Sequence, residues 1–157
     1  MFGYNRSIGS QLSCGLTSLD LSKFNTAKVT TMEGMFSGCH NLTSLSLNVT
    51  RFNTTNVTNM ADMFYYCEEI VSLNLRGFNT SNVTTMNAMF FGCKKLKTIY
   101  ASTNFTTTKL TSTYSSNYMF ASCFNLVGGN STKYDKNVTD KTYARIDKKN
   151  QKGYFTQ

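Results

Sequence analysis

The sequence predicts an α/β fold: a right-handed solenoid of about four coils of 26–30 residues, with short parallel strands, short helices and a C-terminal β-hairpin cap. Three observations predict this fold. One short unit recurs four times along the 157 residues. Each unit joins an alternating apolar stretch to a stretch with helical spacing. The composition is skewed as a copied unit would skew it, with 12 Phe, 8 Met, no Pro and no Trp.

The cysteines align the copies of the unit. The steps from Cys39 to Cys67, Cys93 and Cys123 are 28, 26 and 30 residues. Each of these cysteines ends a Met-Phe-x-x-Cys stretch, and the earlier part of each unit follows Leu-x-x-Leu-x-Leu and Phe-Asn-Thr, most loosely in the fourth copy. A unit of this size cannot bury its own apolar face, so we expect the copies to stack.

Each unit contains two periodicities. The leucine stretch alternates, so Leu19 and Leu21 are expected on the inner face of a short strand. The methionine stretch has apolar residues at i, i+3, i+4 and i+7, which is one face of a helix; in the first copy they are Met32, Met35, Phe36 and Cys39. An equally good interpretation makes residues 29–32 a second extended piece and starts a short helix near Gly34.

Three segments are expected along the chain. Residues 1–15 keep only Cys14 of a preceding unit and are interpreted as the remnant of an upstream repeat. Residues 16–127 form the repeat, and residues 128–157 form a capping segment whose alternation predicts the hairpin. The net charge is +8, and residues 131–157 hold seven basic against three acidic residues, which we interpret as a solvated face.

The repeat resembles the BspA-like leucine-rich-repeat surface proteins of bacteria. The resemblance is carried by Leu-Thr-Ser-Leu-x-Leu, Phe-Asn-Thr-x-x-Val-Thr-x-Met and Met-Phe-x-x-Cys, and by the closing motifs Val127-Gly-Gly-Asn130 and Gly153-Tyr-Phe-Thr156. It extends from about Leu12 to Thr156. It implies a secreted or surface-anchored repeat protein, with adhesion as the usual assignment. It therefore places the chain outside the cell or on its surface, although no signal peptide stands at residues 1–15.

The outward positions of the predicted strands are the candidate binding face. In a leucine-rich repeat this sheet lines the concave surface, where partners commonly dock. The candidate residues are Ser18, Asp20, Ser44, Ser46, Ser72, Asn74, Arg76, Thr98 and Tyr100. An alternative interpretation is a plain solvated sheet without a partner.

Other constellations indicate no chemistry. The five cysteines fit a ladder of buried free thiols better than disulfides, and the absence of Cys-x-x-Cys argues against a metal site. His40 follows Cys39, but adjacent residues seldom face each other, so it is interpreted as a surface residue and not as a catalytic partner. No cofactor, catalytic residue or nucleic-acid partner is expected, and no apolar run of about 20 residues could span a membrane.

These observations predict a non-enzymatic surface or secreted protein that recognises a protein or glycan ligand on a host or neighbouring cell. The alternative is a structural subunit that self-associates, because coils with an incompletely covered N-terminal end could stack end to end into filaments.

Overall fold

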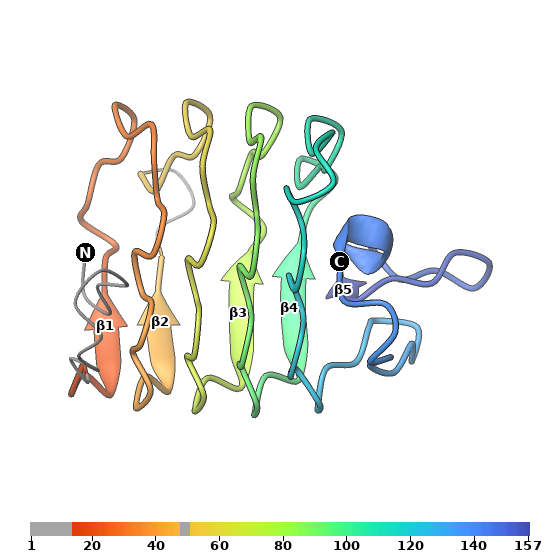
Figure 1. The fold of residues 1–157 in the computed structure, drawn as a ribbon. Coiled ribbons are helices and arrows are strands. Elements are labelled where there is room, and N and C mark those ends of the chain that lie inside the picture. The colour runs from red at the N-terminus through yellow and green to blue at the C-terminus, as the bar shows by residue number, and fades with distance from the viewer. Residues whose placement is uncertain (1–13, 48–50) are drawn as a thin grey trace.

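The computed structural model describes residues 14–47 and 51–157. Copies of the repeat lie side by side from the N-terminus to the C-terminus (Figure 1). All the named strands pair in parallel, in a two-stranded sheet of order β1-β2 and a three-stranded sheet of order β3-β4-β5. The elements are β1 (Ser18–Asp20), β2 (Ser44–Ser46), β3 (Ser72–Leu75), β4 (Thr98–Ala101), the 3₁₀ turn η1 (Lys141–Tyr143) and β5 (Phe155–Thr156).

The predicted fold class, an α/β right-handed leucine-rich-repeat solenoid with short helices and a C-terminal β-hairpin cap, is wrong. The described residues are nearly all coil, contain no α-helix, and carry only short parallel strands in two small sheets. In place of the predicted C-terminal hairpin, the chain returns to the sheet and adds a parallel strand. β5 pairs in parallel with β4, and Ile146 makes a single parallel bridge to Phe155.

Two tight turns occupy the stretch that was expected to be helical. In the first copy Gly34 and Gly38 have φ values of 59° and 74°, in the left-handed region. The carbonyls of Met32 and Phe36 each accept a hydrogen bond from the N–H three residues later, at 3.2 and 3.1 Å. A left-handed residue every fourth position interrupts an α-helix and suits a β-turn. The next copies repeat these angles at the equivalent positions, Asp62, Tyr66, Ala88, Gly92, Tyr118 and Ser122.

Backbone groups in these turns bond to the neighbouring copy and not along their own segment. The N–H groups of Gly34, Phe36 and Gly38 donate to carbonyls in the second copy at 2.9, 2.9 and 2.7 Å. The second and third copies do the same with the copies that follow them. Because buried backbone groups need partners, this ladder satisfies donors that a helix would have satisfied internally.

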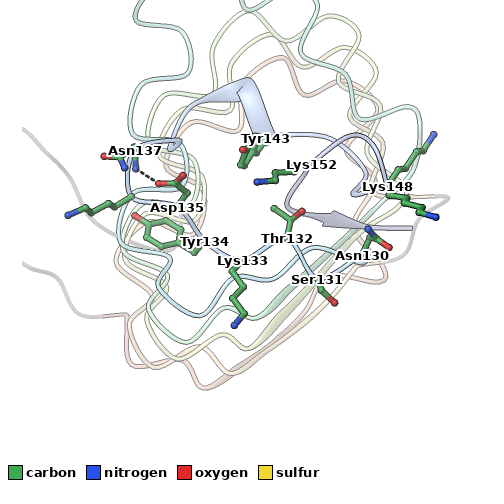
Figure 2. Close-up of a pocket in the computed structure, with 12 residues that line it drawn as sticks. Asn130, Ser131, Thr132, Lys133, Tyr134, Asp135, Asn137, Tyr143, Lys148 and Lys152 are labelled. Atoms are coloured by element: carbon green, nitrogen blue, oxygen red, sulfur yellow. Dashed lines mark hydrogen bonds between the residues drawn. The ribbon is translucent and has the colours of Figure 1, made fainter.

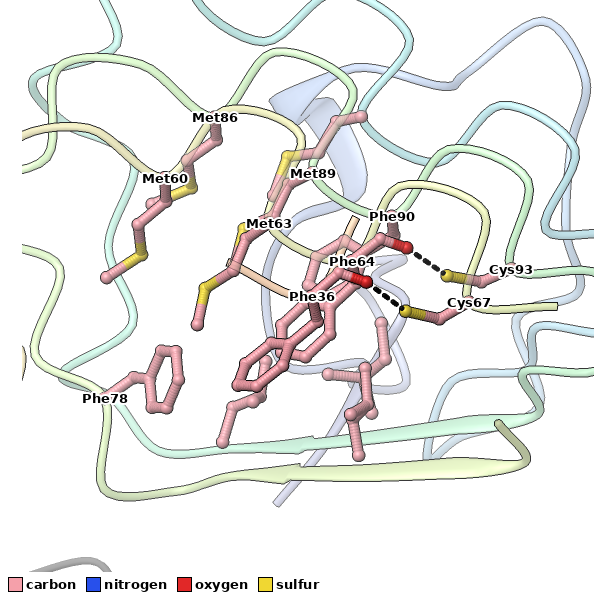
Figure 3. Close-up of a cluster of buried hydrophobic side chains, with 14 of the residues drawn as sticks. Phe36, Met60, Met63, Phe64, Cys67, Phe78, Met86, Met89, Phe90 and Cys93 are labelled. Atoms are coloured by element: carbon pink, nitrogen blue, oxygen red, sulfur yellow. Dashed lines mark hydrogen bonds between the residues drawn. The ribbon is translucent and has the colours of Figure 1, made fainter. Parts of the chain in front are cut away.

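Stacked phenylalanines run through the core. Phe36, Phe64, Phe90 and Phe120 are fully buried, and successive ring centroids lie 5.2, 5.7 and 5.4 Å apart. The thiols of Cys67 and Cys93 donate to the carbonyls of Phe36 and Phe64 (Figure 3). All five cysteines are buried thiols and none forms a disulfide, which confirms the expected thiol ladder.

A second ladder uses buried threonine hydroxyls. Thr54 Oγ1 donates to the Asn79 carbonyl at 2.9 Å and accepts from the Asn79 N–H at 2.8 Å. Thr80 makes the same pair of bonds with Thr106 at 2.7 Å each. The asparagine before each threonine closes a local turn instead; Asn53 Oδ1 accepts from the Thr55 N–H at 2.8 Å. The Asn-Thr pair therefore combines a turn with a link between copies.

The C-terminal segment closes the end of the Phe stack. Tyr154 and Phe155 are buried, and their rings meet Phe120 edge-on, with centroids 5.0 and 6.0 Å away. The segment is itself organised by one buried carboxylate. Asp147 accepts four hydrogen bonds, from the N–H groups of Asn130, Thr132 and Gly153 and from the Thr132 hydroxyl, at 2.7–3.2 Å.

Candidate functional site

The candidate binding residues lie along the outward positions of the four repeat strands. On β1 and β2 the register sets Ser18 beside Ser44 and Asp20 beside Ser46. On β3 and β4 it sets Ser72 beside Thr98 and Asn74 beside Tyr100. Thr98 and Tyr100 are half-buried, and the others are exposed. The strands therefore bring these residues together as two groups, one on each sheet.

Arg76 directly follows β3 and is held over β4. Its guanidinium carbon lies 4.3 Å from the centre of the Tyr100 ring, and its Nη2 donates to the carbonyl of Gln157 at 2.9 Å. A guanidinium this close to a ring face makes a cation–π contact. Tyr100 on β4 and Gln157 near β5 therefore hold the side chain of Arg76, the one arginine among the candidate residues.

Asp20 carries the negative charge of the face. Its Oδ1 accepts from the Ser22 N–H at 2.8 Å. This backbone bond, with further help from the Ser22 and Ser46 hydroxyls, lowers the pKa of Asp20 below its ordinary value. Asp20 is therefore ionised over the physiological pH range, and it lies on the other sheet from the Arg76–Tyr100 pair.

The neighbours Cys39 and His40 lie in different surroundings. Cys39 is buried in the core, and burial is the main cause that raises the pKa of its thiol well above the ordinary value. His40 instead faces the next copy, where its Nδ1 lies 3.7 Å from a carboxylate oxygen of Glu68. Within residues 14–47 and 51–157 no three His, Cys, Asp or Glu side chains gather as a metal site would require.

A pocket in the C-terminal segment was missed by sequence reasoning. It is an open hollow of about 600 Å³ between residues 130–137 and 148–152, with Tyr143 at its side (Figure 2). The basic excess of residues 131–157 was its one signal in the sequence, and that excess was interpreted as a solvated face. Strand patterns could not reveal it, because it is built from loops that Asp147 ties together.

In the part of the chain that the structure describes, no helix has the length and apolar character that crossing a bilayer requires.

Comparison with known proteins yields one family. No curated protein and no solved structure matches the chain. A family model described as "Mycoplasma protein of unknown function, DUF285" matches residues 10–134. That description mentions neither leucine-rich repeats nor BspA-like proteins, so the resemblance noted from the motifs stays a prediction. The match covers most of the sequence, and the chain therefore belongs to the DUF285 family.

Proposed function

We propose that this chain is a non-enzymatic recognition module whose outward strand face docks a protein or glycan on a host or neighbouring cell. The observation that carries the proposal is the Arg76–Tyr100 pair, with its 4.3 Å stacking distance and its bond to the Gln157 carbonyl. Arginine and tyrosine are the residue types that most often dominate binding interfaces. A secreted or surface location fits this proposal and comes from the resemblance to BspA-like proteins.

Rigidity favours this patch as the centre of an interface. A free arginine loses side-chain entropy when a partner immobilises it, by about 0.5–1.5 kcal/mol. Arg76 has already been ordered by contacts within the chain. Around it, Ser72, Asn74 and Thr98 are small and polar, so a partner can approach the strands closely without burying an unpaired charge.

Chemistry at the Cys39–His40 pair is less well supported. A catalytic cysteine acts as a thiolate, and burial keeps the Cys39 thiol neutral. His40 lies beside Glu68 of the next copy. This arrangement favours binding over catalysis as the function.

The C-terminal segment counts against the filament alternative. End-to-end stacking needs an open strand edge at each end of the molecule. The edge of β4 that faces away from β3 is already paired with β5. A second copy of the chain would have to displace β5 before it could add to that edge.

Binding of fluorescently labelled chain to cultured epithelial cells tests the proposal. We expect saturable binding that the double substitution Arg76→Ala/Tyr100→Ala weakens about tenfold, the range of a modest hot spot. Arg76→Lys keeps the charge but loses the planar stacking, so it should weaken binding partially. Lys28→Ala, an exposed change away from the strands, is the control.

Two results would contradict the proposal: no saturable binding to the cells, or equal binding by the wild type and the double variant. Protease or glycosidase treatment of the cells then distinguishes a protein from a glycan partner. Sedimentation of the purified chain tests the alternative, because concentration-dependent polymers that survive Arg76→Ala would favour a structural subunit.

A further inference from the structure

The C-terminal pocket has the size of a ligand site. Its volume of about 600 Å³ falls within the range of about 300–1,000 Å³ that small-molecule sites occupy. It lies in the segment beyond β4, apart from the outward strand residues of the proposed function. Two loops form it, residues 130–137 and residues 148–152, and Asp147 holds both by accepting hydrogen bonds from Asn130, Thr132 and Gly153. One buried carboxylate therefore ties the two loops of the pocket together.

The charge on the pocket is strongly positive. Only one acidic residue, Asp135, lines it, and that carboxylate accepts from the Asn137 N–H at 2.9 Å. Against it stand five lysines, Lys133, Lys136, Lys148, Lys149 and Lys152. Within the described ranges 14–47 and 51–157, none of these five ammonium groups forms an ion pair.

Two lysines of the repeat, by contrast, are compensated by carboxylates. Lys94 and Lys95 pair with Glu68 and Glu69 of the neighbouring copy, with N–O distances of 3.1 and 2.7 Å. The repeat thus places a carboxylate beside each of these two lysines, whereas the five lysines of the pocket share a single lining carboxylate, that of Asp135. A hollow lined mainly by charge of one sign concentrates counter-ions, so an anionic ligand is favoured here.

Two tyrosines form fixed walls of the pocket. The Tyr134 hydroxyl accepts from the Ser122 N–H at 3.2 Å, and its ring meets Phe124 edge-on at 5.8 Å. The Tyr143 ring packs edge-on against Tyr154 at 5.2 Å. Rings held in this way offer apolar surface without further ordering, which suits the flat apolar face of a sugar ring.

Neutral polar groups complete the lining. The amides of Asn130 and Asn137 and the hydroxyl of Ser131 can donate to and accept from ligand hydroxyls. A bare inorganic anion would leave these groups and the tyrosines unused. A nucleic acid is matched less well, because its backbone needs a basic groove to follow and this positive charge lies around a local hollow.

We propose that this pocket binds an acidic oligosaccharide, whose sulfate or carboxylate groups pair with the lysines while its rings lie against Tyr134 and Tyr143. Figure 2 shows Lys152 near the centre of the pocket, between Tyr143 and Thr132, with Lys133 and Lys148 on different sides. Lys152 is therefore placed to contact a bound ligand directly. The other lysines select for charge at its rim.

Calorimetric titration of the whole chain tests this site at physiological ionic strength. The probes are a heparin-derived tetrasaccharide, a tetramer of galacturonate, the neutral maltotetraose and inorganic sulfate. We expect an acidic tetrasaccharide to bind and maltotetraose not to bind. Lys148→Gln/Lys152→Gln should weaken binding about tenfold. Lys23→Gln/Lys28→Gln removes the same charge outside the pocket and should stay within about twofold.

A second variant separates a sugar site from a simple anion site. Tyr143→Leu should weaken the tetrasaccharide but leave inorganic sulfate unchanged, because only the sugar uses the ring. Heparin-only binding identifies sulfate as the recognised group, and binding of galacturonate as well identifies any acidic sugar. The strand-face variant Arg76→Ala/Tyr100→Ala should leave this affinity unchanged, so the two sites fail or succeed separately.

The proposal is overturned if neither acidic tetrasaccharide binds, or if inorganic sulfate binds as tightly as the tetrasaccharide. Equal losses in the pocket variant and the outside variant would also overturn it, since they would indicate general attraction of anions to a basic protein. A single-stranded oligonucleotide of equal charge that binds more tightly than either sugar would identify a different ligand class. Thermal melts show that each variant is folded before its affinity is compared.

Discussion

Replacing Asp147 by Asn tests whether one carboxylate holds the C-terminal segment together. Asp147 is buried, and each of its oxygens accepts two hydrogen bonds. Asparagine keeps one oxygen, which can still accept from the Thr132 hydroxyl and Gly153. Its amide nitrogen would face the N–H groups of Asn130 and Thr132, which now lie 2.8 and 2.9 Å from the carboxylate oxygen Oδ2.

The expected loss of stability follows from those two bonds. A hydrogen bond to a charged group contributes about 1.5 kcal/mol or more, so losing two should lower the free energy of unfolding by about 3 kcal/mol. In a chain of 157 residues that corresponds to a fall in Tm of about 10 °C. Urea unfolding followed by circular dichroism measures the change. Asp140→Asn is the matched control, because Asp140 accepts one bond from the Thr142 N–H and asparagine caps equally well.

The pH dependence gives an independent check. Burial alone would raise the pKa of Asp147, but the hydrogen bonds from Thr132, Asn130 and Gly153 outweigh it and lower the pKa below 3.8. The carboxylate's contribution is therefore complete above about pH 3.8 and is lost as the pH falls through the lowered value. The difference between wild type and Asp147→Asn should shrink in acid. A difference below 1 kcal/mol at neutral pH, or one that grows in acid, would refute this account of the segment.

Three further substitutions probe other parts of the structure. Gly128→Ala would place a Cβ 2.2 Å from the Gly153 carbonyl, so we expect a loss above about 3 kcal/mol in urea unfolding, whereas Gly129→Ala, with 3.3 Å to Thr156, should cost far less. Thr54→Val keeps the shape of the side chain but removes both hydrogen bonds to Asn79 of the next copy, so it should lower the free energy of unfolding by about 2 kcal/mol. The control Thr55→Val, at an exposed position, should have little effect. Tyr118→Gly should raise Tm, because glycine adopts the observed φ of 57° without strain and the tyrosine side chain is 61% exposed. The control Tyr114→Gly should lower Tm, because Tyr114 is 74% exposed but has no positive φ to relieve.

The strands were predictable because their signal is local. Alternation at Leu19, Leu45 and Leu73 locates β1, β2 and β3, and a strand's period of two settles which side chains point outward. The recurrence of one cysteine in each copy, at steps of 28, 26 and 30 residues, also predicted the ladder of buried thiols that the structure shows. Short parallel strands are the part of the expected fold that the structure retains.

The prediction of short helices was wrong because a helix and a pair of tight turns share the same spacing of apolar residues. Apolar residues at i, i+3, i+4 and i+7 face one side of a helix, but they also face inward from two successive four-residue turns. Gly34 and Gly38 hinted at the turns, since glycine favours positive φ. In the second copy Asp62 and Tyr66 take the same positive φ angles, although neither is glycine, so the residue types there gave no sign of the turns. Hydrogen bonds between copies outweigh the preference of these residues for negative φ.

The hairpin and the Arg76–Tyr100 pair lay beyond local reasoning for a related reason. Alternation in residues 142–147, followed by a turn and residues 153–156, predicts a hairpin, but β5 pairs in parallel with β4 and makes only a single parallel bridge to Ile146. Arg76 reaches Tyr100 and Gln157 only because the register of β3, β4 and the chain end places them side by side. Pairings across such sequence separations are decided by packing of the whole molecule.

The thiol ladder should make the protein sensitive to alkali. Burial is the main cause that raises the pKa of Cys123 from 9.0 to about 12, partly offset by a backbone hydrogen bond, and it raises the pKa of Cys67 and Cys93 in the same direction. Folding therefore favours the neutral thiol. Its contribution is complete below pH 9 and is lost as the pH rises toward the folded value. At pH 10 each such thiol should lower the free energy of unfolding by about 1.4 kcal/mol, since the unfolded thiol is then one unit above its pKa.

Cys123→Ser isolates that effect at one position of the ladder. Serine does not titrate in this range, and its hydroxyl can donate to the Phe90 carbonyl as the thiol does at 3.0 Å. We expect the variant to be less stable at pH 7, but its loss between pH 7 and pH 10 to be smaller than the wild type's by about 1.4 kcal/mol. Urea unfolding with a reductant at both pH values measures this. The neighbouring core change Phe120→Leu destabilises without removing a titrating group, so its alkaline loss should equal the wild type's. An alkaline loss that is the same in wild type and Cys123→Ser would mean that the buried thiols do not set the upper pH limit of the fold.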